Sequence, residues 1–370
     1  MKNVLYITKL PIEAPWDEAN KNLAYLLATQ LKNYQIFLLT TKNGSSNDPN
    51  TTLERIIVYS KHNVDFFQKV RIMSWILSTG KKIDLIHSFF TPAGITSNML
   101  RIAVSKHKAR LIQTVPTVNF EKHSDYKTLL RADAVVAVSD YTADLLKKYG
   151  CANVHRIYPG VDLKRFSPAD GHNTLRDSLG IALNAPVVLY AGEYKRLQSF
   201  DNLLRWMPLV AKKIPEVRFV LAVRIKFKSE FKIEYRIKKQ IEQLGLKENV
   251  LIIRDIEDTA QLYNLATVNV LPAKTMAGKF DLPLSVLESM ACGCPIIISE
   301  NMVLKELFES NIGYQISYED TKQWAEVVAD LLKDQQKCTQ IGAQGRRVAE
   351  SKFNITDIAK QYEALYENIL

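Results

Sequence analysis

The sequence predicts an α/β protein of two domains, each built on a doubly wound parallel sheet. The chain has 370 residues, the length of two domains of ordinary size. Short β-branched runs alternate with helical patterns, and this alternation passes through the chain twice. Between the two series lies a stretch rich in Pro, Gly, Asp and Asn, residues 155–173, without a helical period. These observations predict two sheets joined by one linker.

The expected strands form two series, because strands buried in a parallel sheet appear as short apolar, β-branched runs. The first series comprises residues 4–8, 35–40, 53–58, 85–88, 111–114 and 134–138. The second comprises residues 187–191, 219–222, 250–253, 268–271 and 295–299. Helical patterns lie between most of these runs, for example at residues 22–31 and 142–148.

The composition also sets the expected domain boundaries. The linker falls near residues 166–173, so we expect a first Rossmann-like domain over residues 1–167 and a second over residues 168–353. Residues 354–370 are expected to form a final helix, whose apolar face carries Ile358, Tyr362, Leu365 and Ile369.

The composition excludes several classes of protein. With 47% hydrophobic and 24% charged residues, the chain is typical of globular proteins and unlike disordered or fibrous ones. No run reaches the roughly 18 apolar residues that a membrane span needs. The opening MKNVLYITKL is short and β-branched, which favours a buried strand over a signal peptide. We therefore expect a cytoplasmic protein.

The cysteines indicate neither disulfides nor a zinc site. Cys292 and Cys294 have one residue between them, and no matching His or Cys pair lies elsewhere. We expect these residues, with Cys151 and Cys338, to be small buried side chains in a reducing compartment.

The formal charge of +10 suits anionic partners such as nucleotides, phospholipid headgroups or nucleic acid. No RNA-binding, zinc-finger or helix-turn-helix pattern accompanies it, so we do not expect nucleic-acid binding. Residues 61–82, KHNVDFFQKVRIMSWILSTGKK, mix cations with large apolar side chains. This segment is either an interfacial membrane helix or an ordinary amphipathic helix that covers the first sheet.

The most informative stretch is GKFDLPLSVLESMACGCPIII, residues 278–298. A loop leads into an apolar helix with one carboxylate, Glu288, and a β-branched strand follows. A glutamate near a helix start lies among partly positive backbone N–H groups, where it can accept hydroxyls from a ligand. The alternative is a glutamate that only complements the helix dipole.

Several blocks in this order resemble the family 4 glycosyltransferases. They are RADAVVAVSDYTADLLKKYG followed by VHRIYPGVDLKRFSP, then PVVLYAGEYKRLQSFDNLL, then LYNLATVNVLPAKTMAGKFDLPLSVLESMACGCPIII. The resemblance covers nearly the whole chain. It implies the GT-B fold, in which two Rossmann-like domains face a cleft and the last helix packs back on the first domain. It also implies transfer of a hexosyl group from a UDP- or GDP-sugar, with retention of configuration and without cofactor or metal.

The chemistry of such a transfer sets what the site must supply. Negative charge builds on the departing diphosphate, so cations or helix N-termini must meet it. Carboxylates and amides must orient the sugar hydroxyls, and the reacting atoms must be held close in a site that excludes water. The chain has no Asp-x-Asp motif to hold a divalent cation, which independently favours a metal-free mechanism.

The chain departs from the family at the second of its two usual glutamates, eight positions before Glu288. Phe280 occupies that place and cannot accept a hydrogen bond from a hydroxyl. Asp281 is adjacent and is the best substitute, although an Asp before Leu-Pro can also simply shape the turn. The neighbouring Leu282 and Ser285 complete the expected donor region.

The phosphate-binding cations also depart from the family. Glu193 and Gln198 stand where the resemblance implies Arg and Lys. We expect other cations to take over: Lys195 and Arg196, which lie in the same loop as Gly192, Arg224 at the end of the next strand, and Lys279 in the donor loop. The alternative for Arg224 and Lys279 is solvated surface charge. This pattern predicts a variant branch with relocated charges.

The first domain departs too. Its first loop, KLPIEAPWDEANKNLA, lacks the family's Gly-Gly pair, and Pro116 or Thr117 takes the place of the family's histidine. The candidates for acceptor contacts are Trp16, Asn20, His87 and His123. An ordinary strand-to-helix loop and structural histidines are the alternatives.

The resulting hypothesis is a glycosyltransferase with Glu288, Asp281 and Lys279 at its centre. The acceptor is a glycan, a glycolipid or a small molecule, and cell-envelope or polysaccharide biosynthesis is the expected setting. Residues 61–82 provide for peripheral contact with the inner face of a membrane. The rival hypotheses are a GT-B protein that binds a nucleotide or glycan without transferring sugar, a GT-B epimerase or phosphorylase, and a nucleic-acid-binding protein.

Overall fold

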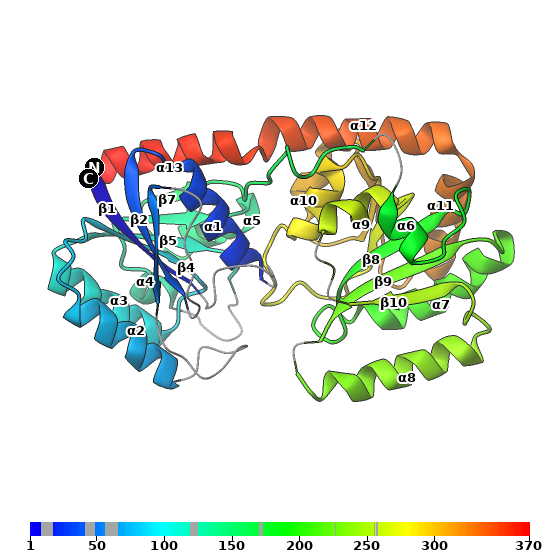
Figure 1. The fold of residues 1–370 in the computed structure, drawn as a ribbon, viewed down its shortest axis with the longest axis horizontal. Coiled ribbons are helices and arrows are strands. Elements are labelled where there is room, and N and C mark those ends of the chain that lie inside the picture. The colour runs from blue at the N-terminus through cyan, green and yellow to red at the C-terminus, as the bar shows by residue number, and fades with distance from the viewer. Residues whose placement is uncertain are drawn as a thin grey trace. The chain divides into compact units, whose positions relative to one another are not determined.

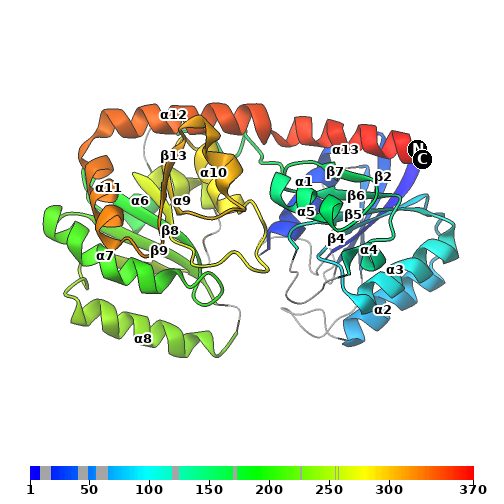
Figure 2. The ribbon, with the colours of Figure 1, turned by 180° about the vertical axis from the view of Figure 1, so that it is seen from behind.

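The computed structural model describes residues 1–8, 18–40, 49–55, 66–118, 125–169, 173–225, 227–254, 256 and 258–370. The contacts divide the chain into two units, drawn from opposite sides in Figures 1 and 2. Unit 1 contains Met1–Gly160, Ala277–Leu282 and Phe353–Leu370. Unit 2 contains Val161–Met276 and Pro283–Lys352. Each unit has its own parallel sheet, which confirms the predicted fold class.

Unit 1 is built on a seven-stranded sheet in the order β3-β2-β1-β4-β5-β6-β7, and neighbouring strands in it are parallel. The strands are β1 (Lys2–Ile7), β2 (Tyr34–Thr40), β3 (Thr51–Arg55), β4 (Leu85–Phe89), β5 (Arg110–Val115), β6 (Ala134–Ala137) and β7 (Val154–Arg156). The strand order reverses between β1 and β4, and ligands of doubly wound sheets bind at such a reversal.

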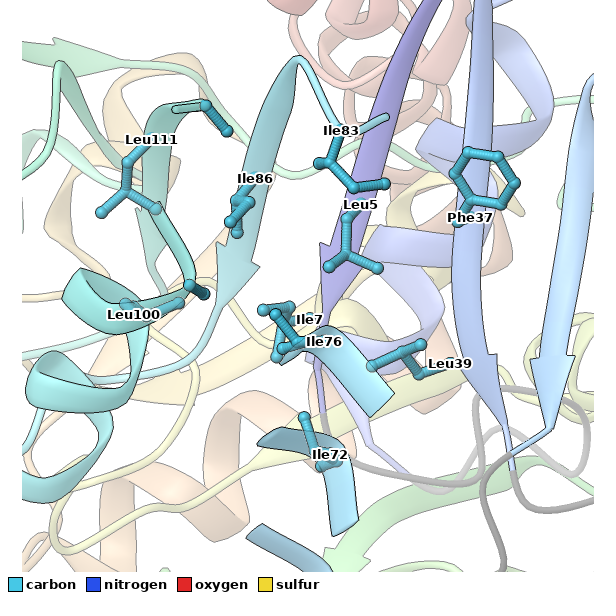
Figure 3. Close-up of a cluster of buried hydrophobic side chains, with 12 residues drawn as sticks. Leu5, Ile7, Phe37, Leu39, Ile72, Ile76, Ile83, Ile86, Leu100 and Leu111 are labelled. Carbon is cyan, nitrogen blue, oxygen red and sulfur yellow. The ribbon is translucent and has the colours of Figure 1, made fainter. Parts of the chain in front are cut away.

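Helices cover both faces of this sheet. They are α1 (Ala19–Gln30), α2 (Phe66–Ser78), α3 (Gly94–His107), α4 (Tyr126–Leu129), α5 (Asp140–Lys148) and α13 (Ile355–Ile369). Figure 3 shows Leu5, Ile86 and Leu111 of the strands packed with Ile76 of α2 and Leu100 of α3. Alternate residues point to the other face, where Tyr6 of β1 meets Tyr366 of α13. The amphipathic segment predicted at residues 61–82 therefore does cover the sheet where it is described.

Unit 2 has a six-stranded parallel sheet in the order β10-β9-β8-β11-β12-β13, with the reversal between β8 and β11. The strands are β8 (Val187–Glu193), β9 (Arg218–Arg224), β10 (Val250–Ile253), β11 (Val268–Leu271), β12 (Ile296–Ser299) and β13 (Gly313–Ile316). Its helical elements are α6 (Thr174–Ser178), α7 (Ser199–Lys213), α8 (Glu230–Gln243), α9 (Thr259–Leu265), α10 (Leu284–Ala291), η1 (Lys305–Ser310), α11 (Thr321–Lys333) and α12 (Gln335–Lys352).

Two strands were not predicted, and both lie at sheet edges. β7 and β13 are short, and most of their residues are partly or fully exposed, so neither carries an apolar run. The contacts divide the chain after Gly160, whereas the composition placed the boundary after residue 167. They also group Phe353–Leu370 with the first sheet, and Ile358, Tyr362 and Leu365 are buried there.

Candidate functional site

In unit 2, the candidate site begins at the carboxyl edge of the sheet, next to the strand reversal. Glu193 ends β8 and pairs in register with Arg224, which ends β9. The buried Glu193 carboxylate binds Arg224 Nη2 at 3.2 Å and lies 3.8 Å from Arg196 Nε. Glu193 thus holds two cations at this edge, one of them on the neighbouring strand. Their net charge stays positive, at two cations against one carboxylate.

The other predicted residues of this loop lie beside that cluster. Gly192 precedes Glu193 at the end of β8 and is partly exposed, and the Lys195 side chain is exposed. A Cβ at position 192 would lie 2.4 Å from the Tyr190 ring, so a larger residue there would displace the tyrosine. Arg196, Arg224 and Lys195 were all predicted from the sequence, whereas the ion pairs of Glu193 with the two arginines were not.

Glu288 does not lie in the first turn of its helix, which corrects the prediction. α10 begins at Leu284, after Pro283 at its N-cap, so Glu288 is the fifth helical residue. The backbone N–H groups without a helical partner lie in the first turn, and the Glu288 carboxylate comes after that turn. The argument from the helix dipole does not apply to it.

Burial, rather than the helix dipole, has the largest effect on the pKa of Glu288. Its side chain is 8% exposed, and the Tyr263 hydroxyl of α9 donates to Oε2 at 3.0 Å. Burial raises the pKa of Glu288 to about 7, although the Tyr263 hydrogen bond and the charge of Arg165 both lower it. Near neutral pH this group is divided between the acid and the carboxylate, and the carboxylate retains unused acceptor positions. Neither Tyr263 nor Arg165 was predicted, although both lie in the blocks that carry the resemblance.

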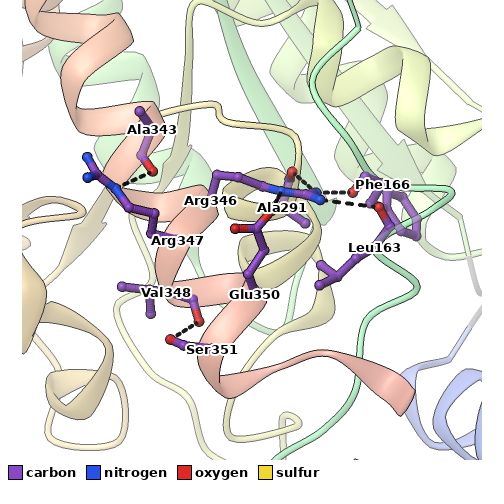
Figure 4. Close-up of polar contacts among 9 residues, drawn as sticks. All are labelled: Leu163, Phe166, Ala291, Ala343, Arg346, Arg347, Val348, Glu350 and Ser351. Carbon is purple, nitrogen blue, oxygen red and sulfur yellow. Dashed lines mark hydrogen bonds and ion pairs between the residues drawn. The ribbon is translucent and has the colours of Figure 1, made fainter. Parts of the chain in front are cut away.

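Arg346 of α12 fixes the far end of α10 (Figure 4). Its Nη1 donates to the carbonyls of Ala291, the last residue of α10, and Phe166, both at 2.7 Å. A further contact reaches the Leu163 carbonyl at 3.5 Å. One guanidinium therefore joins the segment beside Arg165 to the helix that carries Glu288. A cation is favourable at this helix end, because the final carbonyls have no helical partner.

Asp281 is a structural residue in unit 1, which corrects its assignment to sugar binding. Its side chain is 2% exposed, and Oδ2 accepts hydrogen bonds from Ser139 at 2.5 Å and Thr142 at 2.6 Å. Thr117 also donates to it, and the Asp281 backbone N–H donates to the Pro116 carbonyl at 3.0 Å. Burial raises the pKa of this carboxyl, while the three hydroxyls lower it. The surrounding hydroxyls already use its acceptor positions.

The remaining donor-side candidates are divided between the units. Leu282 is buried and Lys279 is partly exposed, and both belong with Asp281 to unit 1. Ser285 is partly exposed in the first turn of α10 in unit 2. The structure therefore groups Arg224, Arg196, Lys195 and Ser285 with Glu288, and it does not group Lys279 with them.

His87 is part of the interior of unit 1, which corrects its assignment to acceptor binding. Its side chain is fully buried, with Nδ1 at 2.5 Å from the Tyr366 hydroxyl and Nε2 at 2.7 Å from Thr114 Oγ1. Burial holds the pKa of His87 well below its usual value. Asn20 is partly exposed in the first turn of α1. Trp16 and His123 lie outside the described residues.

Unit 1 has an apolar cavity beside its own strand reversal. The cavity is about 170 Å³ in volume and lies between α2, α3 and the end of β1. Its lining includes Ile7, Thr8, Ile72, Met73, Met99 and Leu100. The buried Thr8 hydroxyl has no hydrogen-bond partner among the described residues. The lining is mostly apolar, with Lys69 as its charged member.

Two further properties concern the described residues. None of their helices combines the length and apolar character needed to cross a bilayer. No group of three or more His, Cys, Asp or Glu side chains in this part of the chain is arranged to hold a metal ion.

Comparison with known proteins gives two family matches. Residues 172–348 match "Glycosyl transferases group 1", and residues 22–165 match "Glycosyltransferase Family 4". The chain is 25% identical over 296 residues to D-inositol 3-phosphate glycosyltransferase of Xylanimonas cellulosilytica. This alignment covers 77% of this chain and 66% of that protein. It is 29% identical over 250 residues to spore coat protein SA of Bacillus subtilis, with 63% of this chain and 64% of the relative covered. The matches thus span slightly less than two thirds of these relatives' lengths.

Solved structures share the fold. The Anabaena HepE protein, solved in complex with UDP and glucose, superposes with a TM-score of 0.80 at 17% identity, and both chains are covered completely. At this identity the likeness concerns the fold alone, which it identifies as GT-B. The relatives of this chain include named glycosyltransferases. Each half of the chain thus matches a glycosyltransferase family model, and the two halves lie on a GT-B fold.

Proposed function

We propose that this chain is a hexosyltransferase that moves a sugar from a UDP- or GDP-sugar to an acceptor hydroxyl, with retention of configuration and without a metal. The observation that carries the proposal is the arrangement at one edge of unit 2. Arg196 and Arg224 meet there through Glu193, and the same unit contains Glu288, a buried carboxylate to which Tyr263 is the side-chain donor among the described residues. The HepE complex with UDP and glucose supports a UDP-sugar as the donor.

In the proposed mechanism, the cations meet the charge that builds on the leaving diphosphate. Arg224, Arg196 and Lys195 contribute, and Glu193 keeps the two arginines in place. The chain is then a variant in which phosphate-binding cations have moved along the sheet edge. Lys279, which comes from unit 1, remains a proposed further contact.

Glu288 would accept hydrogen bonds from donor-sugar hydroxyls in its ionised form. The acceptor hydroxyl attacks the anomeric carbon from the face that the diphosphate leaves, and its proton passes to the departing phosphate oxygen. The new glycosidic bond forms as the bond to the phosphate breaks, so no protein base is required. Ionisation of Glu288 near pH 7 predicts that donor binding strengthens as the pH rises through that value.

The acceptor is proposed to be a glycan or a lipid-linked glycan of cell-envelope biosynthesis. The apolar cavity of unit 1 supports an acceptor with a hydrocarbon part. The outer side of α2 supports peripheral membrane contact, because Phe67, Val70 and Leu77 are exposed there near Lys69 and Arg71. Residues 61–65 of the predicted membrane segment lie outside the described residues.

The test is release of nucleotide from UDP- and GDP-sugars, with and without lipid acceptors, by the wild type and Glu288→Gln. Glutamine keeps an acceptor for Tyr263 but cannot carry charge. We expect a 10²- to 10³-fold loss of kcat/KM, the cost of removing one charged group from a preorganised site. Thermal shift with UDP or GDP should be unchanged, since the diphosphate contacts remain.

Glu248→Gln, at an exposed position of unit 2, is the matched control and should transfer normally. Unchanged turnover in Glu288→Gln would refute the assignment of Glu288. Nucleotide binding by the wild type without any sugar transfer would support the rival hypothesis of a binding protein, which the relatives do not favour.

A further inference from the structure

The outer face of α8 in unit 2 carries a line of exposed aromatic rings. Phe231 and Tyr235 are four residues apart within the helix, so they lie along one side of it, and Phe227 lies just before the helix begins. The exposed fractions of Phe227, Phe231 and Tyr235 are 48%, 52% and 60%, and the Arg254 guanidinium lies 5.4 Å from the Phe231 ring centroid. Large apolar side chains scattered singly on a surface need no explanation, but three so close together in the chain do. We call these three residues the α8 aromatic stripe.

A second line of cations runs beside this stripe. Lys228, Lys232 and Arg236 each follow an aromatic residue directly, and Lys239 lies 4.9 Å from the Tyr235 ring centroid. The side chains of Lys228, Lys232 and Arg236 are exposed, and no carboxylate among the described residues is within ion-pair distance of them. Each helical turn therefore presents one ring and one unpaired cation.

Two acidic residues of α8, Glu230 and Glu234, are buried beside the α8 aromatic stripe, and Glu234 is three residues after Phe231. Glu230 is 5% exposed, and its Oε2 accepts from the Phe227 N–H at 3.1 Å. Glu234 is 4% exposed and accepts from Tyr194 at 2.8 Å, Lys238 at 2.8 Å and Arg254. Glutamate is seldom buried unless it is paired. Both of these acids have partners in the interior, whereas Glu242, near the end of α8, is the exposed acid of the helix.

We propose that the outer face of α8 binds the surface of an anionic lipid bilayer. The rings of the α8 aromatic stripe would enter the boundary between headgroups and acyl chains, and the cations would meet lipid phosphates. A bilayer surface offers anionic headgroups next to apolar acyl chains, which suits exposed rings and exposed cations that lie side by side on one helix. The net charge of +10 is complementary to such a surface.

Single-stranded nucleic acid is a weaker match, because such chains are bound in basic grooves with bases stacked on aromatic rings. The α8 face is the convex surface of a helix. The bilayer contact belongs to unit 2 and is distinct from the α2 contact proposed for unit 1. It also stands independently of the proposed sugar transfer.

The test is co-sedimentation of the full chain with vesicles of phosphatidylcholine alone or with 30% phosphatidylglycerol, at about 50 and 500 mM salt, where screening of charges differs strongly. One variant carries Phe231→Gln and Tyr235→Gln, and another carries Lys232→Glu and Arg236→Glu. The matched controls are Leu183→Ser, at an exposed apolar position, and Lys212→Glu with Lys213→Glu on α7. All these positions are on the surface, so unchanged melting temperatures will show that the variants fold.

We expect the wild type to bind the anionic vesicles, and to lose most of this binding at high salt. Each α8 variant should bind them at least tenfold more weakly, while the controls remain within about twofold. Nucleotide release from a sugar donor in the absence of vesicles should not change. Equal binding by the α8 variants and the wild type would overturn the proposal. The proposal would also be overturned if the wild type bound neutral vesicles as strongly as anionic ones. It would be overturned too if the α8 variants lost affinity for single-stranded DNA but not for vesicles.

Discussion

Glu288 and Asp281 are both buried carboxylates, seven residues apart in the sequence, yet their surroundings differ. Three hydroxyl groups donate to Asp281, and its acceptor positions are largely used. Tyr263 is the hydrogen-bond donor that the described residues supply to Glu288, and burial raises the pKa of Glu288 to about 7. The comparison separates two functions of a buried acid. One joins parts of a fold, and the other keeps acceptor capacity for a ligand, which leaves the folded protein less stable.

The largest expected effect on stability comes from Glu288→Gln. The unfolded carboxyl ionises near pH 4.5 but the folded one near 7, so the wild type loses stability as the pH rises between these values. Glutamine does not ionise, and the variant should gain up to about 3 kcal/mol over the wild type above pH 7. Urea denaturation at pH 5 and pH 8 measures this. If the variant is less stable than the wild type at pH 8, Glu288 is a structural residue like Asp281.

Asp281→Ala should lower the free energy of unfolding, whereas Glu288→Gln should raise it above pH 7. The hydroxyls of Ser139, Thr142 and Thr117 would lose a shared acceptor inside unit 1, at a cost of about 2–3 kcal/mol. Asp281→Asn keeps one acceptor oxygen and should lose less. Denaturation at pH 7 measures both, with kcat/KM of the folded protein as the second readout. If Asp281→Asn keeps its stability but loses sugar transfer, Asp281 acts on the substrate, and it does not differ from Glu288 in the way described above.

The position of α10, the helix that carries Glu288, can be tested through its contact with α12. A Cβ on Gly342 of α12 would lie 1.9 Å from the Gly293 carbonyl oxygen, just beyond α10. Gly342→Ala should therefore displace this contact and cost about 2 kcal/mol. At Gly345, one turn further along, the nearest atoms are 3.8 Å away, so Gly345→Ala is the matched control. It should be neutral or stabilise by up to about 1 kcal/mol. Equal melting temperatures for the two variants would contradict the close packing.

A smaller effect concerns His87, a buried group whose two ring nitrogens both have partners. Burial lowers its pKa in the folded state, so the folded chain stays neutral while the unfolded chain takes up a proton. Stability is therefore retained above pH 6.5 and falls below it, by about 1.4 kcal/mol per pH unit from this group. His87→Gln should make the curve of unfolding free energy against pH shallower by that amount between pH 6.5 and 5. Parallel curves would show that His87 is protonated in the folded state.

Most of the fold could be predicted from local pattern. Strands at sheet centres are buried on both faces, so β1, β4 and β8 appear in the sequence as apolar runs. The edge strands β7 and β13 could not be found this way, because their sequences, VHR and GYQI, contain no apolar run. The site was predicted only in part. Glu288 and the cations of the β8–β9 edge carry sequence signals, whereas Tyr263 and Arg346 act through contacts that no local pattern records.

The sequence by itself determined the two parallel sheets, the helix that carries Glu288 and the surplus of cations, because each depends on residue type and spacing along the chain. The tertiary structure decided what those residues do. It placed Asp281 against three hydroxyls, His87 between Tyr366 and Thr114, and Glu193 between two arginines. The physical reason is that a polar side chain takes its protonation state and its partners from groups brought to it by folding, many of them more than a hundred residues away in the chain.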